Sequence, residues 1–402
     1  MSRKMEVLFK DQSEKSELSD CTTFGLDQAK KAITFHRSFP EYQPTPLVEL
    51  KELSKQFGVD QIFVKDESCR FSLNAFKVLG GSYCIGNYIA KRLGVDISAL
   101  TYDKITDPET RKKLGDVTFV TATDGNHGRG IAWTANRLGQ KSVVYMPKGS
   151  SAERLNNIRL LGAEASITEL NYDDTVRQAS RYVEENGGVL VQDTSWPGYE
   201  EIPSWIMQGY TTMAYEAVEQ LEGVKPTHVI LQAGVGAMSG AITGFFSDLY
   251  KEERPVIAIV EPESADCIYC TAKADNGKLA TVKGDLKTIM AGLACGEPCG
   301  IGWKILRDHV DCYASVPDYV AANGMRILGN PAGKDKRVIS GESGAVTMGF
   351  LAEILSNPDY RTIKEKLKLD SSSKILLIST EGDTDKENYK RIVWDGAYSR
   401  YE

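Results

Sequence analysis

A lysine stands three residues before a pair of glycines in the segment SLNAFKVLGG, residues 72–81, where a helix is expected to begin. Its amine is either a solvated surface group or a nucleophile that can form an imine with a carbonyl compound. The second role requires a dry site that favours the neutral amine. Lys77 is therefore the first candidate for chemistry, and other segments must decide between these interpretations.

A glycine-rich turn follows a strand in LQAGVGAMSGA, residues 231–241, and a helix follows the turn. Glycines let backbone N–H groups turn inward, and a helix N-terminus adds positive partial charge, so an anion such as phosphate could bind here. Taken alone, the segment could equally be a tight turn that packs a helix. The candidate anion-binding residues are Gly234, Val235, Gly236, Ala237 and Met238.

The same turn also fits a second interpretation, a dinucleotide-binding domain. An acid that ends the next strand, here Glu261, is what such a domain uses to bind the ribose hydroxyls. Against this, the third glycine is displaced to Gly240 and Lys77 has no role. An NAD-dependent dehydrogenase is kept as a remote alternative.

A polar turn lies between a strand and a helix in TATDGNHGRG, residues 121–130, with the helix expected from about His127. Exposed N–H groups at a helix start can bind a carboxylate. Asp124 is a possible base, and the amide of Asn126 could lie against a ring substituent. The alternative is capping of the helix by Asp124 or Asn126, with His127 in a packing role. The candidates for substrate binding in this turn are Thr123, Asp124, Gly125 and His127.

Two hydroxyl residues, Ser379 and Thr380, end an apolar strand in ILLISTEGDTD, residues 375–385. A hydroxyl can bond a neutral ring nitrogen, whereas a carboxylate would protonate it. Each hydroxyl could also simply cap the strand. Lysine, anion cradle, ring-facing amide and hydroxyl together are what the carbonyl cofactor pyridoxal phosphate requires.

Short β-rich runs alternate with helical stretches such as residues 152–163 and 173–188, which predicts βαβ units and a mostly parallel sheet. The runs are almost continuously apolar, as expected when both sheet faces are covered. Ligands of such sheets bind at the carboxyl ends of the strands, where the candidate residues lie. The predicted strands are residues 61–67, 116–123, 141–147, 189–194, 228–234, 256–262 and 374–380.

The composition is that of a globular protein. The chain has 402 residues, of which 42% are hydrophobic and 26% charged, and a formal charge of −7 without blocks of like charge. This argues against nucleic acid or an anionic membrane as a partner. The N-terminal segment lacks the apolar core of a signal peptide and no apolar run of 18 residues occurs, so a cytoplasmic location is expected.

Four of the eight cysteines form two close pairs, Cys267 with Cys270 and Cys295 with Cys299. Two such pairs could bind structural zinc, but the second pair lacks the usual spacing. Ordinary thiols or a disulfide across the loop are the favoured alternatives. No catalytic metal is expected.

The segments NAFKVLGG, TDGNHGRG, GVGAMSGA, SGESGAV and STEGDTD resemble the pyridoxal-phosphate enzymes of fold type II, the tryptophan synthase β-like group. Within that group, SLNAFKVLGGSY, TATDGNHGRGIAW, VQDTSW and ISTEGDTD resemble the diaminopropionate ammonia-lyases. The resemblance implies an α/β fold with two interleaved, open, twisted and mostly parallel sheets flanked by helices. It also implies a large cofactor-binding domain, residues 1–83 and 201–402, and a small domain, residues 84–200.

The resemblance assigns roles to individual residues. Lys77 would carry the cofactor as a Schiff base and return as a base in proton transfer. Residues 234–238 would bind the cofactor phosphate, and Asn126 would contact the ring hydroxyl. Thr380, or alternatively Ser379, would face the pyridine nitrogen.

Two aspartates distinguish the implied reaction, elimination from 2,3-diaminopropionate to pyruvate and two ammonia. Many relatives have serine and no acid where this chain has Asp124. Asp124 and Asp193 could hold the C3 ammonium of the substrate or move protons, although Asp193 could also only cap a turn. Lys77 and Asp124 on opposite faces of the cofactor could serve both enantiomers. Glu342 in SGESGAV would line the site.

Three alternatives remain at this stage. A serine or threonine dehydratase of the same fold expels hydroxide and needs no ammonium-binding acids. A dehydrogenase is the remote possibility, and a cofactor-binding or regulatory relative without activity is the third. The resemblance further implies a small-molecule amino acid substrate, amino acid catabolism and a homodimer.

Overall fold

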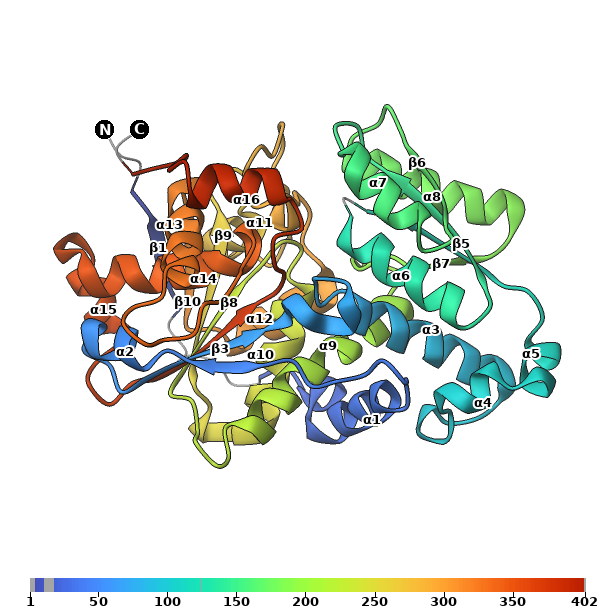
Figure 1. Ribbon diagram of the computed structural model, residues 1–402, viewed down its shortest axis with the longest axis horizontal. Helices are drawn as coiled ribbons and strands as arrows, with labels where there is room; N and C mark the ends of the chain where they lie inside the picture. Colours follow the sequence, from blue (N-terminus) through green and yellow to red (C-terminus); the bar gives the residue numbers. More distant parts are fainter. Residues whose placement is uncertain (1–3, 11–17, 124, 401–402) are drawn as a thin grey trace. The chain divides into compact units, whose positions relative to one another are not determined.

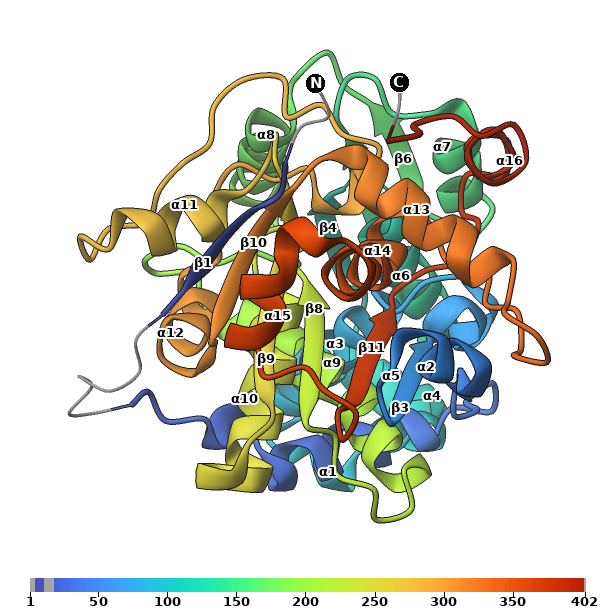
Figure 2. The same ribbon diagram turned by 90° about the vertical axis from the view of Figure 1, so that its left-hand side faces the viewer.

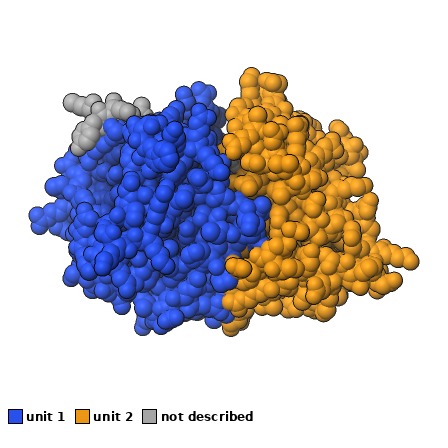
Figure 3. All heavy atoms as spheres, viewed as in Figure 1, with its two compact units in different colours: residues 1–26, 44–75, 213–402 blue, residues 27–43, 76–212 orange. Residues whose placement is uncertain are grey.

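The structure, a computed structural model, describes residues 4–10, 18–123 and 125–400. The chain divides into two compact units, coloured separately in Figure 3. Unit 1 comprises residues 1–26, 44–75 and 213–402, and unit 2 comprises residues 27–43 and 76–212. Each unit has a sheet of its own and the units interleave along the sequence, as expected. The division at residues 83 and 200 stays a prediction.

The sheet of unit 1 has seven strands among the described residues, in the order β1-β10-β9-β8-β11-β3-β2 (Figure 2). The five inner strands are parallel, and β1 and β2 pair antiparallel at the two edges. The sheet is therefore mostly parallel, as predicted. Its strands are β1 (Glu6–Phe9), β2 (Leu47–Glu49), β3 (Gln61–Asp66), β8 (His228–Gln232), β9 (Val256–Pro262), β10 (Cys312–Val316) and β11 (Lys374–Ser379).

Helices flank this sheet. α14 contacts β8, β9 and β11, and it packs against α13, while α10 packs against α12. No helix in the described ranges is long and apolar enough to cross a membrane. The helices of unit 1 are α2 (Lys51–Phe57), α10 (Ala237–Tyr250), α11 (Cys267–Ala274), α12 (Gly300–His309), α13 (Asp318–Gly329), α14 (Glu342–Ser356), α15 (Arg361–Lys366) and α16 (Lys386–Val393); α9 (Glu201–Gln220) runs across the division.

The sheet of unit 2 has four parallel strands in its described part, in the order β6-β5-β4-β7. These are β4 (Thr118–Ala122), β5 (Lys141–Met146), β6 (Glu164–Ile167) and β7 (Val189–Leu190). The helices that Figure 1 labels in this part of the chain are α1 (Leu26–Arg37), α3 (Val78–Leu93), α4 (Tyr102–Thr106), α5 (Pro108–Leu114), α6 (Asn126–Arg137), α7 (Ala152–Arg159) and α8 (Tyr172–Asn186).

Both faces of the unit 2 sheet are covered, which explains why its strands are apolar at successive positions. Val144 packs in a cluster with Ala132 of α6 and Ile158 of α7. Its neighbour Val143 points to the other face and packs in a cluster with Ala179 of α8. Successive side chains of a strand alternate between faces, so each must be apolar here.

The strand order places a switch point in each sheet. In unit 1 the chain passes from β8 to β9 and β10 on one side and later returns to β11 on the other side of β8. In unit 2 it passes from β4 to β5 and β6, and returns to β7 on the other side of β4. Loops diverge at such points and leave room for a ligand beyond the carboxyl ends of the strands.

Four strands in the described ranges were not predicted from the sequence: β1, β2, β6 and β10. Three of them, β1, β2 and β6, lie at sheet edges and have only three or four residues, so they carry little periodic signal. The predicted strand at residues 189–194 is shorter in the structure, because only Val189 and Leu190 pair as a strand with β4. Helix α7 likewise ends at Arg159 rather than near residue 163.

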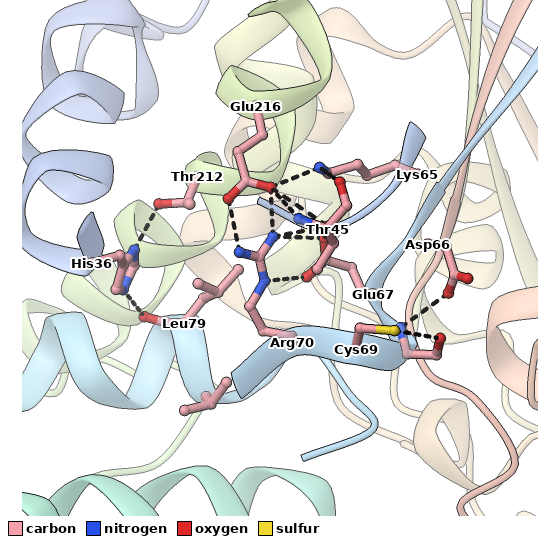
Figure 4. A network of polar contacts seen from close by, with 12 residues as sticks. His36, Thr45, Lys65, Asp66, Glu67, Cys69, Arg70, Leu79, Thr212 and Glu216 are labelled. Carbon is pink, nitrogen blue, oxygen red and sulfur yellow. Dashed lines mark hydrogen bonds and ion pairs between the residues drawn. The ribbon is translucent and has the colours of Figure 1, made fainter. Parts of the chain in front are cut away.

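A buried network of charges in unit 1 includes residues shortly before the candidate lysine in the chain (Figure 4). Arg70 binds Glu67 and Glu216 at 2.7–2.9 Å. Lys65 lies 2.6 Å from Glu216, and the hydroxyl of Thr45 donates to Glu67 at 2.6 Å. The two positive and two negative side chains are fully buried. Charges in such surroundings persist only when paired and hydrogen-bonded.

The segment after Arg70 has an unusual backbone. Phe71, Ser72 and Asn74 have φ values of +47°, +59° and +57°, which cost roughly 1–2 kcal/mol each outside glycine. The charge network fixes the start of this segment, and an isolated bridge between Ala75 and Glu381 fixes its end. The chain that leads into Lys77 is therefore held at both ends.

Candidate active site

Lys77 and Asp193 meet at the switch point of the unit 2 sheet. Lys77 is the N-cap residue of α3, and Asp193 lies three residues beyond β7. The amine of Lys77 donates to Oδ2 of Asp193. The side chain of Lys77 is 21% exposed and that of Asp193 is 7% exposed. The surroundings of Lys77 thus include a buried negative charge, which the sequence argument for a dry, neutral amine did not anticipate.

The charge of Asp193 is stabilised by its neighbours. Burial alone raises the pKa of its carboxyl, but the Lys77 ammonium and the nearby His127 outweigh this effect and lower the pKa to about 2. Asp193 is therefore ionised at neutral pH. A carboxylate with so low a pKa is a weak proton acceptor and a good partner for a cation.

His127 and Thr123 organise the start of α6 beside this pair. His127 Nε2 lies 2.8 Å from the carbonyl oxygen of Val191, and its Nδ1 lies 3.9 Å from Asp193. The hydroxyl of Thr123 accepts the N–H groups of Gly125 and Gly128 at 2.9 and 3.1 Å. Thr123 therefore caps α6, the task that the sequence analysis gave to its neighbours.

The two remaining candidates of this turn are Asn126 and Asp124. Asn126 is half-buried and is the first residue of α6, one position earlier than the predicted helix start. Asp124 lies outside the described residues. Gln192 was missed: its side chain accepts the N–H of Ala122 at 3.1 Å and ties the segment before Asp193 to β4. A polar residue directly before Asp193 in an otherwise apolar run was the available signal.

The glycine-rich turn of unit 1 joins β8 to α10, as predicted. Gly236 has φ = +88°, and a Cβ atom there would lie 2.9 Å from Ile268. At Gly234 a Cβ atom would lie 3.2 Å from the backbone of Leu293. The first turn of α10 has no acidic residue, and its first N–H groups have no partner within the helix. The turn therefore offers N–H donors and positive partial charge to an anion.

Thr380 lies at the carboxyl end of β11, which neighbours β8. Its hydroxyl accepts from Gln232 Nε2 at 2.9 Å and donates to Glu381 Oε2 at 2.8 Å. The hydroxyl of Ser379 donates instead to Ser340, at 2.8 Å. Gln232 and Glu381 were missed, although Gln232 follows directly on apolar strand residues and Glu381 directly on Thr380.

Glu342 begins α14 in the same unit and is 8% exposed. Burial raises the pKa of its carboxyl to about 7, although hydrogen bonds, including one from Asn388, act in the opposite direction. Glu342 can therefore exchange a proton near neutral pH.

Glu261 does not serve a dinucleotide. It is fully buried, and its carboxylate accepts the N–H groups of Ile268 and Tyr269 at 2.9 and 2.6 Å, which caps α11. At Gly240, a Cβ atom would lie 2.8 Å from Gly302, so this glycine lets α10 approach α12. The acid that suggested a dehydrogenase therefore caps a helix, and Gly240 serves helix packing.

None of the eight cysteines, all of which lie in the described ranges, forms a disulfide in the structure, so the disulfide considered for the loop is not supported. No group of three or more metal-ligating side chains occurs among the residues described, which also leaves the zinc interpretation without support there. Cys267 is fully buried, and burial raises its pKa well above the usual value for a thiol.

Comparison with known proteins identifies the family to which the chain belongs. The family model described as pyridoxal-phosphate dependent enzyme matches residues 39–380. The chain therefore belongs to the pyridoxal-phosphate dependent enzymes, and its two mostly parallel sheets are those of fold type II.

Within that family the chain belongs with the diaminopropionate ammonia-lyases. It is 53% identical over 370 residues to the diaminopropionate ammonia-lyase of Salmonella typhimurium, which covers 91% of this chain and 92% of the relative. The enzyme of Escherichia coli K12 is 51% identical over 378 residues, 94% of each chain. A crystal structure of holo diaminopropionate ammonia lyase from Escherichia coli matches with a TM-score of 0.92 and 48% identity, covering 100% of this chain and 99% of that one.

The residues present fit pyridoxal phosphate. A Cβ atom at Gly236 would meet the side chains of Ile268 and Leu306, so glycine is what allows the backbone of the turn to lie as it does. Two buried polar atoms near the ends of β8 and α10, Gln232 Oε1 and Ser239 Oγ, have no hydrogen-bond partner within the described part of the chain. Unsatisfied buried polar atoms are rare in proteins and indicate a ligand or water.

Proposed function

We propose that this protein uses pyridoxal phosphate to eliminate ammonia from 2,3-diaminopropionate. The Cα–H bond and the C3–N bond break, which releases ammonia and aminoacrylate. Aminoacrylate hydrolyses in water to pyruvate and a second ammonia. The contact between Lys77 and Asp193 carries the proposal, because it joins the candidate cofactor lysine to an acid suited to an ammonium group.

Pyridoxal phosphate, when bound, supplies an electron sink for the charge left at Cα. Lys77 would hold it covalently, and the N–H groups of residues 234–238 would bind its phosphate. Asn126 would contact the ring hydroxyl, and the Thr380 hydroxyl would donate to the ring nitrogen in place of Glu381. A hydroxyl keeps that nitrogen neutral, which limits the carbanion stabilisation that would favour transamination.

Asp193 holds an ammonium group. Its low pKa makes it a stable anion at neutral pH, and Lys77 is the cation beside it in the structure. The C3 ammonium of the substrate has the same charge and the same three donors as a lysine ammonium. Asp193 can therefore bind the substrate whenever the Lys77 ammonium does not occupy that place. A dehydratase expels hydroxide and therefore does not need an acid that binds an ammonium group.

Proton transfer at Cα is assigned to Lys77 on one face of the cofactor and to Asp124 on the other. This arrangement would let one site use both enantiomers of the substrate. Thr123, Gly125 and His127 belong to the turn that would bind the substrate carboxylate at the start of α6.

The first test is pyruvate release from each enantiomer of 2,3-diaminopropionate, with serine and threonine measured beside them. Fast release from diaminopropionate and slow release from the hydroxy amino acids is the expected result. The reverse pattern would keep the cofactor and Lys77 but make the protein a dehydratase. Absence of cofactor absorbance in the purified protein would contradict the proposal entirely.

A homodimer in the cytoplasm remains part of the proposal. The resemblance to fold type II enzymes supports the dimer, and the lack of an apolar run of 18 residues is the reason for expecting the cytoplasm. Light scattering after size-exclusion chromatography tests the dimer, which predicts a mass twice that of the 44.3 kDa chain.

A further inference from the structure

The segment that carries Asp193 leaves the sheet early. Strand β7 pairs with β4 only through Val189 and Leu190, and one further bond joins the N–H of Val191 to Val120. We propose that the hydroxyl of Tyr199 holds residues 190–193 in place and so positions Asp193 against its ammonium partner. The inference rests on the proposed role of Asp193.

A tight turn returns the chain to the end of β7. The residues Trp196-Pro197-Gly198-Tyr199 form a turn in which the N–H of Tyr199 donates to the carbonyl of Trp196 at 2.9 Å. Gly198 has φ = +89°, as the third position of a type II turn requires, and proline is favoured at the second. The rings of Trp196 and Tyr199 stack with centroids 4.3 Å apart. This turn delivers the Tyr199 hydroxyl to Leu190.

The hydroxyl of Tyr199 takes the place of a neighbouring strand. It donates to the carbonyl of Leu190 at 2.8 Å and accepts the N–H of Gln192 at 2.9 Å. These two groups point to the same side of the chain, away from β4, because successive residues of an extended chain alternate. Strand β7 is at the edge of its sheet, so no strand satisfies them.

Two other side chains hold the opposite side of the segment. Gln192 donates to the hydroxyl of Tyr172 at 2.8 Å and accepts the N–H of Ala122. His127 contacts the carbonyl of Val191 at 2.8 Å. The Tyr199 hydroxyl is thus the contact on the side of the segment that faces away from β4. Without it, the hydrogen bonds described here hold residues 190–193 from the β4 side only.

The experiment compares Tyr199→Phe with Tyr182→Phe in the holoenzyme. Both tyrosines pack against the apolar cluster that contains Leu190, but Tyr182 lies in α8 outside residues 190–199. Tyr199→Phe is expected to lower kcat about 10- to 100-fold and to raise KM, because Asp193 holds the C3 ammonium both in the bound substrate and as it leaves, and small misplacement of such a group is costly. Tyr182→Phe should retain the activity of the parent.

The double variant Tyr199→Phe with Asp193→Asn shows whether Tyr199 positions Asp193 or has a merely structural role. If Tyr199 acts through Asp193, Tyr199→Phe lowers kcat by less than about twofold in the Asp193→Asn background. The same loss in both backgrounds would overturn the inference. If Tyr199→Phe does not fold, Gly198→Ala replaces it as the test variant. A Cβ atom at position 198 meets nothing within 4 Å, so the substitution strains only the turn that places Tyr199. It should show the same dependence on Asp193.

A spectroscopic measurement keeps this inference distinct from the proposed function. A carboxylate beside the Lys77 nitrogen favours its protonated form. The pH midpoint of the absorbance of the lysine-bound cofactor should therefore fall in Asp193→Asn, fall partly in Tyr199→Phe and remain unchanged in Tyr182→Phe. An unchanged midpoint in Tyr199→Phe would refute the inference. Failure of diaminopropionate to yield pyruvate would refute only the proposed function.

Discussion

Lys77 and Asp193 are 116 residues apart in the chain, yet the lysine amine donates directly to the aspartate carboxylate. The contact forms because Lys77 is the N-cap residue of α3 and the chain leaves β7 three residues before Asp193. It brings the candidate cofactor lysine and an ionised acid to one switch point. The pair is therefore the feature on which the site predictions depend most.

The charge on Asp193 should make the cofactor-free protein sensitive to acid. Because its folded pKa is about 2, below the unfolded value near 4, its contribution is complete above pH 4 and is lost as pH falls through about 2. The stability difference between the parent and Asp193→Asn should therefore shrink by roughly 2 kcal/mol in this range. Urea unfolding at several pH values measures it. Asp116→Asn, which removes an exposed partner of Lys141, is the control, and a pH-independent difference for Asp193→Asn would contradict the prediction.

Asp124→Asn should suppress turnover of one enantiomer of 2,3-diaminopropionate far more than the other. The reason is that each enantiomer presents its Cα proton to a different face of the cofactor, and a positioned base contributes about 10²- to 10⁴-fold. Pyruvate release from the separate enantiomers is the measurement. Equal losses for both would rule out a face-specific base.

Gly236→Ala should weaken cofactor binding about tenfold or more. Alanine must adopt φ = +88° there, and its Cβ atom would lie 2.9 Å from Ile268. Gly277→Ala is the matched control, because Gly277 has φ = +75° but nothing within 4 Å of an added Cβ atom. Absorbance titration with pyridoxal phosphate compares the two variants. Equal affinities would show that the turn does not bind the cofactor.

Glu216→Gln should destabilise unit 1 by about 3 kcal/mol or more. Removal of one charge leaves Arg70 and Lys65 without their shared buried carboxylate, and a broken buried pair is more costly than an exposed one. Glu219→Gln, at an exposed position of the same helix, should change little. Chemical unfolding of both variants tests the difference, and similar values would mean that water reaches the network in Figure 4.

Glu342 should make stability fall as pH rises from about 4 to about 7. The folded protein binds a proton more tightly than the unfolded chain in this range, so the protonated form is favoured by folding. Glu342→Gln should remove this slope and be more stable than the parent at pH 8, whereas exposed Glu252→Gln should keep it. Unfolding midpoints between pH 5 and 8 are the measurement, and parallel curves for the parent and Glu342→Gln would contradict the assignment.

Local patterns predicted much of the fold and the class of site. Most inner strands could be found because both faces of each sheet are covered, so apolar residues run continuously, as at Val143 and Val144. The inner strand β10 was missed. The glycine-rich turn before α10 and the polar turn before α6 were found because their conformations require particular residue types. Edge strands such as β1 were missed, since three or four residues at a sheet edge leave little pattern.

The sequence by itself determined the cofactor class and predicts the lysine that would hold it, because both depend on short motifs with definite chemistry. Tertiary structure decided which distant residues meet: that Asp193 binds Lys77, that Glu261 caps α11, and that Tyr199 returns to Leu190. It also decided that Thr123 caps α6. The physical reason is that residue type limits local conformation, whereas contacts across 116 residues depend on strand order and on which buried polar groups find partners.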